Sequence, residues 1–421
     1  MTSPLRHSEI SHPTTLTPGV VPGWPYGQLD VDDLRARGWR PTAFREFVLK
    51  VHQRCNLACD YCYVYELADQ TWRGRPALMS RDTWLAAARR IAEHAERHRL
   101  ARVGVVLHGG EPLLAGTDRL VRLADEVRAA MPTGCELTVG MQTNGVMLDE
   151  STLDRLVRAG ISIGVSVDGA AENHDRHRRY RDGRGSHAAV DRALALLNEP
   201  PHRSSFAGLL CTVDPESDPV ECYEALLGHS PPSIDVLLPH ANWANPPPRP
   251  LGPCSTPYAD WLIAVFDRWY GAPRQETRIR LFEEVMQLLL GGSSRSEQVG
   301  LSPVAVAVVE SDGAIEQVDS LKSAYSGACA TGLDVRSDTF DAALDHPGVV
   351  ARQIGTAALC DDCLACPIHQ VCGAGHYAHR YRPGTGFRSP SVYCADLQKL
   401  IGHVRRRLAD DLSRLEAGSG R

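Results

Sequence analysis

The sequence predicts an α/β protein, a partial (β/α)6 TIM-like barrel followed by a Cys-rich α+β extension. Short apolar, β-branched runs alternate with amphipathic stretches of helical period, and polar motifs follow the ends of successive runs. This alternation implies right-handed βαβ crossovers and a parallel sheet buried on both faces. In such sheets ligands bind at the carboxyl ends of the strands, which is where the polar motifs fall.

The elements are expected in the following order. Residues 1–43 form a mostly irregular lead-in with a short helix near Val31–Arg37. Residues 44–245 form the barrel, with six strands at Phe47–Val51, Val103–Leu107, Leu137–Met141, Ile161–Val167, Leu209–Val213 and Ile234–Leu238. Helices are expected between the strands at Ser80–His98, Thr117–Ala130, Glu150–Ala159, Ser186–Asn198 and Pro219–Leu227.

A Pro-rich stretch then indicates a linker. Residues 246–300 are expected to hold this linker and two bridging helices, at Tyr258–Tyr270 and Arg280–Leu290. Residues 301–421 are expected to form the extension, with a hairpin around Asp312-Gly313 and a final helix from Asp396 to Leu415.

Composition excludes several classes of protein. The 421 residues are 43% hydrophobic and 23% charged, as in an ordinary globular protein. A net charge of −6 argues against a general nucleic-acid binder, and no apolar run approaches the roughly 18 residues of a membrane helix. We expect a cytoplasmic protein whose 13 cysteines stay reduced and free to bind metal.

The first group of cysteines directly follows the first predicted strand, as Cys55-x-x-x-Cys59-x-x-Cys62. Three thiolates on one loop suit an iron–sulfur cube, which leaves one iron open to an external ligand. A zinc site that includes His52 is the alternative interpretation of the same spacing.

The ends of the next three strands carry further candidate binding groups, because carboxyl ends of parallel strands meet at one face. Glycines there allow close backbone approach, and carboxylate, amide, hydroxyl and guanidinium groups can hold a polar ligand. The residues are Gly109, Gly110, Glu111, Asn144, Ser166, Asp168 and Arg178.

The cysteine motif with Tyr63, together with Gly109-Gly110-Glu111-Pro112, Gln142-Thr143-Asn144-Gly145 and Ser166-Val167-Asp168-Gly169, resembles the radical S-adenosylmethionine (SAM) enzymes. The resemblance spans residues 44–240 and implies a [4Fe–4S] cluster whose open iron chelates SAM. Reduction, by a flavodoxin- or ferredoxin-like donor, then cleaves SAM to a 5′-deoxyadenosyl radical that abstracts a hydrogen atom.

The same resemblance assigns SAM-binding roles to individual residues. Gly109 to Glu111 would hold the methionine amine, Ser166 and Arg178 the carboxylate or ribose, and Tyr63 would lie near the adenine. Asn144 and Asp168 belong to the same site by this resemblance.

The second group of cysteines resembles the SPASM domain, which binds auxiliary iron–sulfur clusters in radical SAM enzymes that modify peptides. Its ligand set would be Cys363, Cys366, Cys372 and Cys394, enough for one auxiliary [4Fe–4S] cluster. A zinc ribbon is the alternative.

A second auxiliary cluster has only partial support in the sequence. The family carries Cys where this chain has Val318 and His376, and Cys329 and Cys360 remain as candidate ligands. Asp319 stands where family members can have a substrate-facing carboxylate that acts as catalytic base, and an exposed strand-end Asp is the alternative.

Sequence around these motifs resembles the FxsB-type peptide maturases, notably Trp72-Arg73-Gly74-Arg75-Pro76 and Pro390-Ser391-Val392-Tyr393-Cys394. This resemblance implies a precursor peptide as substrate and a three-residue cyclophane as product, formed by a bond from a side-chain Cβ to an aromatic ring carbon. Sulfatase maturation to formylglycine and thioether formation are the enzymatic alternatives. A cluster-bearing redox sensor without turnover is the non-enzymatic one.

Overall fold

The computed structural model describes residues 23–419, and its ten strands form one sheet. The predicted lead-in up to residue 22 lies outside the described residues. The strand order is β10-β9-β8-β1-β2-β3-β4-β5-β6-β7, parallel from β8 to β7 and antiparallel at β9 and β10. The strands are β1 Glu46–His52, β2 Arg102–Gly109, β3 Glu136–Thr143, β4 Ile161–Ser166, β5 Phe206–Thr212, β6 Ser233–Leu237, β7 Arg278–Ile279, β8 Val306–Val309, β9 Ala314–Glu316 and β10 Ala330–Asp334.

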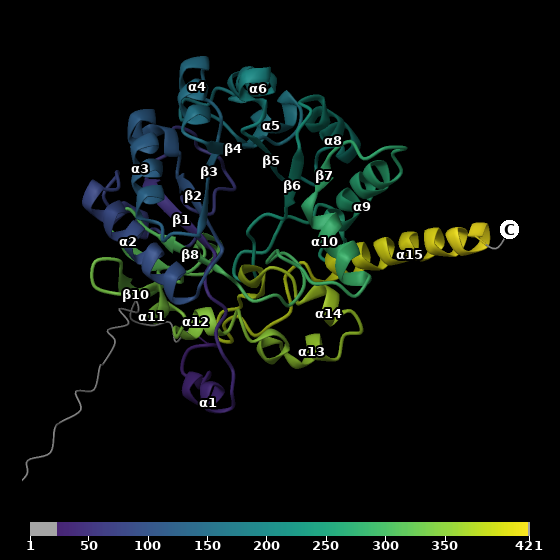
Figure 1. Cartoon of the computed structure of the whole chain (residues 1–421). Helices are drawn as coiled ribbons and strands as arrows, with labels where there is room; N and C mark the ends of the chain where they lie inside the picture. Colours follow the sequence, from purple (N-terminus) through teal and green to yellow (C-terminus); the bar gives the residue numbers. More distant parts are fainter. Residues whose placement is uncertain (1–22, 420–421) are drawn as a thin grey trace, which may run out of the picture.

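Helices cover the outer side of the curved sheet (Figure 1). The predicted partial barrel of six strand–helix units is therefore confirmed. The α-helices are α1 Val31–Ala36, α2 Arg81–Arg97, α3 Thr117–Ala130, α4 Glu150–Arg158, α5 Ala171–His177, α6 His187–Asn198, α7 Pro200–Arg203, α8 Pro219–Gly228, α9 Pro257–Tyr270, α10 Arg280–Leu289, α11 Phe340–Ala343, α12 Pro347–Val350, α13 Asp361–Leu364, α14 His369–Cys372 and α15 Cys394–Ser419. The 3-10 helices are η1 Thr71–Gly74, η2 Pro112–Ala115, η3 Asp319–Ser323, η4 Gly355–Ala358 and η5 Tyr377–Arg380.

Local sequence accounts for the first strand–helix unit. Phe47, Leu49 and Val51 alternate along β1 and are all buried, so this face of the strand packs into the core. Ser80 caps α2 because its hydroxyl accepts a hydrogen bond from the Thr83 amide at 3.1 Å. These features place the loop that follows β1 at the carboxyl end of the barrel.

The hairpin of β8 and β9 extends the barrel sheet, because β8 pairs in parallel with β1. The Asp-Gly turn predicts the hairpin, but it carries no information on which strand the hairpin joins. This pairing brings η3, which begins at Asp319, beside the β1 residue Lys50.

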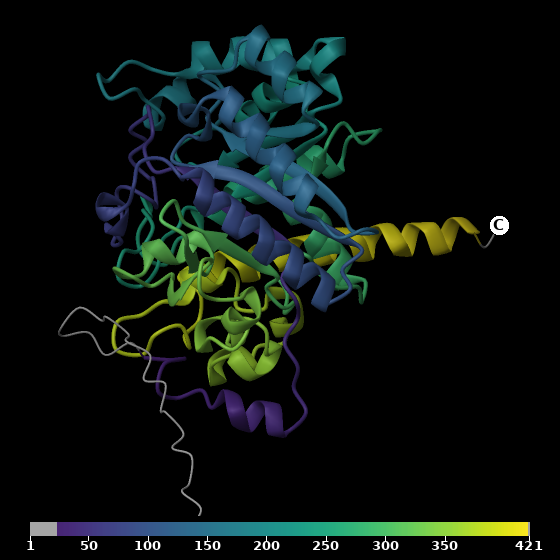
Figure 2. The same cartoon turned by 60° about the vertical axis from the view of Figure 1, so that its left-hand side comes forward.

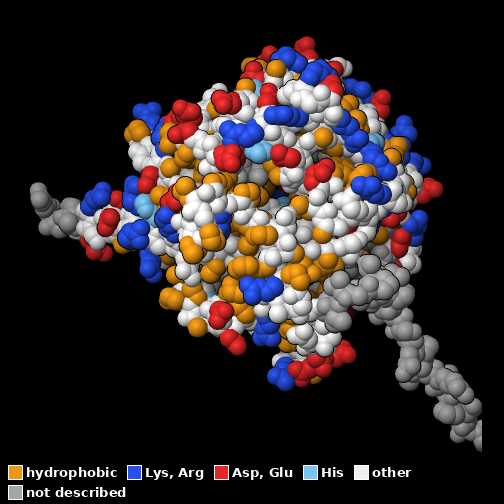
Figure 3. Space-filling model, turned by 180° about the vertical axis from the view of Figure 1, so that it is seen from behind, with side chains coloured by type: hydrophobic (Ala, Val, Ile, Leu, Met, Phe, Trp, Pro, Cys, Tyr) orange, Lys and Arg blue, Asp and Glu red, His pale blue; other side chains and the backbone are white. Residues whose placement is uncertain are grey.

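The C-terminal helix α15 packs against α9, α10 and α14, and its last turns project from the body (Figure 2). Leu400 and Val404 of α15 share one core with Leu49 of β1, and Arg249 of the Pro-rich stretch donates to Asp396 at 2.7 Å. On the face in Figure 3, hydrophobic side chains gather in the centre and charges of both signs are mixed around them. Among the described helices, none has the length and apolar character needed to cross a bilayer.

Candidate active site

Cys55, Cys59 and Cys62 lie on the loop after β1 and line one cavity at the carboxyl ends of the barrel strands. Burial, reinforced by the neighbouring thiols, raises the pKa of Cys55 to about 11 and that of Cys59 to about 12. As free thiols they therefore stay protonated at neutral pH, and metal binding would release protons. Three sulfur donors in one cavity fit an iron–sulfur cluster.

Gly109 and Gly110 allow the end of β2 to touch the cysteine loop. The Gly110 amide donates to the His52 carbonyl at 2.8 Å. A side chain on Gly110 would overlap the Tyr65 hydroxyl and the Arg54 carbonyl, and one on Gly109 would overlap the His52 carbonyl. Both glycines also line the cavity. Their lack of a side chain therefore allows close contact with the cysteine loop and leaves room for a bound ligand.

Glu111 lies in the cavity wall, fully buried, rather than among the residues that line the cavity. Its carboxylate accepts from the Thr143 hydroxyl at 2.7 Å and the Asn144 amide at 2.8 Å. Asn144 itself lines the cavity, and its side-chain amide donates to Asn56 at 2.8 Å and approaches the Cys55 sulfur at 3.7 Å. The carboxylate thus orients the segment that contacts the cysteine loop.

Arg178 is buried at the cavity, where its Nη1 donates to the Tyr61 hydroxyl at 2.8 Å. Tyr61 in turn donates to Asp168, which also accepts from the Thr212 amide at 3.0 Å. The Nε of Arg178 is buried without a hydrogen-bond partner among the described residues. An unpaired guanidinium donor of this kind suits the carboxylate of a bound ligand.

Ser166 and Tyr63 also line this cavity. The Ser166 hydroxyl accepts from Gln142 at 2.9 Å, and the Tyr63 ring meets His240 edge-on with centroids 4.7 Å apart. Tyr61 and His240 were not among the predicted site residues. The position of Tyr61 between Cys59 and Cys62 is the one sequence signal that pointed to it.

Asp319 is buried behind the cavity in an ion pair with the fully buried Lys50. Lys50 Nζ also lies 3.3 Å from the Nδ1 of His108, which lines the cavity. Burial alone would raise the pKa of Asp319, but Lys50, Lys322 and His108 outweigh it and hold the pKa well below its ordinary value. The other carboxylate oxygen, Oδ1, has no hydrogen-bond partner among the described residues.

The cysteines of the second group gather at the start of α15. Cys363 interacts with Cys360, Cys372 and Cys394, and burial raises its pKa to about 12. Gln398 of α15 approaches the sulfur of Cys394 at 3.6 Å and that of Cys366 at 3.9 Å. Four of these thiols would supply a complete cluster, and Cys360 lies beside them as a fifth.

Cys329 lies elsewhere, buried in a separate apolar cluster with Val318 and Tyr377. Its thiol donates to the Val318 carbonyl at 3.4 Å. Its electrostatic neighbours are carboxylates and Lys322. The structure therefore brings Cys360, but not Cys329, to the second thiol group.

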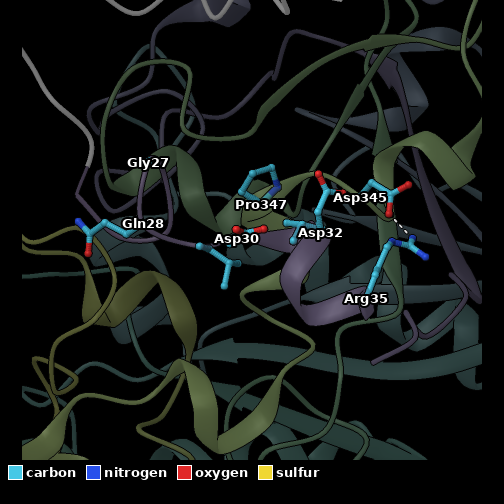
Figure 4. A pocket seen from close by; sticks show the side chains of 9 residues that line it. Gly27, Gln28, Asp30, Asp32, Arg35, Asp345 and Pro347 are labelled. Atoms are coloured by element: carbon cyan, nitrogen blue, oxygen red, sulfur yellow. Dashed lines mark hydrogen bonds and ion pairs between the residues drawn. The ribbon is translucent and has the colours of Figure 1, made fainter. Parts of the chain in front are cut away.

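A separate surface hollow lies between α1 and α12 (Figure 4). Arg35 and Asp345 form an ion pair at its edge, and Asp30, Asp32 and Pro347 line it. None of the predicted site residues lines this hollow.

Residues 49–215 match the model of the Radical SAM superfamily. The chain thus contains a radical SAM domain, and the cofactors of that family are a [4Fe–4S] cluster and SAM.

The chain is similar to anaerobic sulfatase-maturating enzymes in sequence and in fold. A cysteine-type anaerobic sulfatase-maturating enzyme of Clostridium perfringens is 26% identical over 272 residues, 63% of this chain and 71% of that protein. A serine-type one of Klebsiella aerogenes is 32% identical over 174 residues, 41% of each chain. The structure of native anSMEcpe with bound AdoMet covers 87% of this chain and 98% of its own, at 21% identity and a TM-score of 0.75. This last match shows that the two share a fold.

Proposed function

We propose that this chain is a cytoplasmic radical SAM enzyme that forms a three-residue cyclophane in a ribosomally made precursor peptide. SAM, bound to a cluster held by Cys55, Cys59 and Cys62, would supply on reduction a 5′-deoxyadenosyl radical able to abstract a hydrogen atom. The observation that carries the proposal is one cavity lined by these three thiols and by Arg178, whose Nε has no partner in the described part of the chain.

The residues around the cavity would divide the task of binding SAM. Arg178 would pair with the SAM carboxylate through its Nε, and Ser166 and Asn144 would offer a hydroxyl and an amide. Glu111 and Asp168 would act from the wall, since their oxygens already accept hydrogen bonds from Asn144, Tyr61 and backbone amides. They are positioning residues in this proposal.

Cyclophane formation needs a proton acceptor and an electron acceptor besides the radical. The Cβ–H hydrogen atom leaves first, the Cβ then bonds to an aromatic carbon, and one proton and one electron leave the ring. Asp319 would accept the proton, because the Lys50 pair keeps it ionised and its Oδ1 has no hydrogen-bond partner within residues 23–419. The cluster at Cys363, Cys366, Cys372 and Cys394 would accept the electron.

Co-expression with the short open reading frame beside this gene tests the proposal. Tandem mass spectrometry of the peptide should show the loss of two hydrogen atoms, confined to a three-residue span that resists fragmentation, with all thiols still free. Asp319→Asn should cleave SAM but give little crosslink. A product in which a Cys is consumed, or an unmodified peptide beside full SAM cleavage, would refute the cyclophane assignment.

Sulfatase maturation is the second candidate, and the two sulfatase-maturating relatives are the observation that favours it. A hydrazide reagent, which reacts with aldehydes, distinguishes the two activities, because formylglycine forms a hydrazone and a cyclophane does not. Sulfatase-derived peptides with Cys or Ser at the target position are the substrates to compare.

A further inference from the structure

Three histidines meet beside the active-site cavity, and the proposed function uses none of them. His240 follows β6 and lines the cavity, His376 caps η5, and His379 lies within η5. Their ring centroids are 5.0 to 5.9 Å apart, and one nitrogen of each lies within 4.8 Å of the others.

The ring nitrogens of this group are short of hydrogen-bond partners. His379 is 3% exposed, yet neither of its nitrogens has a partner among the described residues. The Nδ1 of His240 is also buried and unpaired there. A buried polar atom without a hydrogen-bond partner lowers the stability of the fold by about 1–3 kcal/mol. These nitrogens are therefore candidates to bind a ligand.

We propose that His240, His376 and His379 bind one divalent transition-metal ion, of the class that prefers imidazole, such as Zn²⁺ or Fe²⁺. Burial holds the pKa of each histidine below its ordinary value, so the rings are neutral, as metal ligands must be. Three protein ligands leave a fourth position open, and one of them, His240, lines the cavity. The site does not depend on the cyclophane assignment.

Binding requires a small rearrangement. Zn–N bonds of about 2.0–2.1 Å place tetrahedral nitrogens roughly 3.3 Å apart, so the rings must turn toward one another. The Nδ1 of His376 accepts a hydrogen bond from the Ala378 amide at 3.3 Å. This bond is lost if Nε2 is the ligand, because Nδ1 then carries the proton of the neutral ring. That contact is long, and a hydrogen bond of this kind contributes about 1 kcal/mol, far less than a metal bond returns.

The surrounding charges are mixed. The positive charges of Arg352 and Arg380 interact electrostatically with His376, and the negative charges of Asp319 and Glu297 interact with His240. A divalent ion would therefore face carboxylates on the His240 side and cations on the other.

A second group of candidate ligands serves as the contrast. His94 and His98 lie 2.7 and 2.8 Å from Asp341, which also pairs with Arg97 at 2.7 Å. Because this carboxylate already has three partners, the group is explained as a network of polar contacts around Asp341 and supplies a matched control.

The test is an anaerobic Co²⁺ titration of the full chain with its iron–sulfur clusters in place, followed by Zn²⁺ competition. Wild type should bind one Co²⁺ with visible d–d absorption and without the sulfur-to-cobalt band of a thiolate site. His379→Gln and His240→Gln should each lose that equivalent, and His98→Gln should keep it. Iron, sulfide and circular dichroism would check that each variant is folded.

Three results would overturn the proposal: no Co²⁺ bound by wild type, retention of the equivalent by folded His379→Gln and His240→Gln, or a sulfur-to-cobalt band. Because the readout is bound metal, its failure is distinct from a failure to form a cyclophane.

Discussion

Replacing Lys50 by Met tests the buried ion pair behind the cavity. The Lys50 side chain is 0% exposed and that of Asp319 is 10% exposed, so the variant leaves a buried carboxylate without its main cation. Breaking a buried pair from one side costs about 3–5 kcal/mol. At 1.36 kcal/mol for each factor of ten, the equilibrium constant for folding falls by about two to four orders of magnitude.

The pH dependence of this loss follows from Asp319. In wild type its pKa is held below the unfolded value of about 3.9, so the pair stabilises the fold above that pH and ceases to do so as pH falls through the folded pKa. In Lys50→Met the pKa of Asp319 should rise, because burial is then opposed by Lys322 and His108 without Lys50, and Asp319 should protonate at a higher pH than in wild type. The difference in unfolding free energy between the two proteins should therefore be largest at neutral pH and shrink as pH falls below the pKa of Asp319 in the variant.

Urea unfolding under anaerobic conditions, followed by tryptophan fluorescence, measures this difference. Lys50→Met/Asp319→Asn should recover most of the loss because neither position then carries a buried charge. Lys399→Met removes a lysine from an exposed pair with Asp260 and should cost at most about 1 kcal/mol. A loss for Lys50→Met no greater than that of Lys399→Met, or no recovery in the double variant, would refute the reasoning.

The remaining predictions concern the two thiol groups and the glycine pair. Cys55→Ala should abolish 5′-deoxyadenosine formation and lower bound iron, whereas Cys135→Ala, at a cysteine outside both groups, should change neither. Cys372→Ala should keep some uncoupled SAM cleavage, seen by chromatography, but form no crosslinked peptide; full product would contradict its role. Gly110→Ala should destabilise the fold by about 1–3 kcal/mol and reduce SAM cleavage, and a wild-type melting temperature and rate would contradict the close contact between β2 and the cysteine loop.

Periodicity predicted the six barrel strands because a parallel strand covered on both faces must be apolar along its length. The cysteine spacing and the strand-end motifs led to the radical SAM domain, which the family match over residues 49–215 confirms. The docking of β8 on β1 was not predicted, since strand pairing depends on residues more than 250 positions apart.

Sequence alone therefore determined the barrel, the two groups of cysteines and the class of cofactor, because these depend on periodicity and on ligands close together in the chain. Only the tertiary structure decided that Glu111 and Asp168 lie in the wall, that Lys50 pairs with Asp319, and that Cys329 stands apart from Cys360. The three-histidine group likewise joins the end of β6 to η5. Such contacts arise when distant segments pack, and no local pattern in the chain records them.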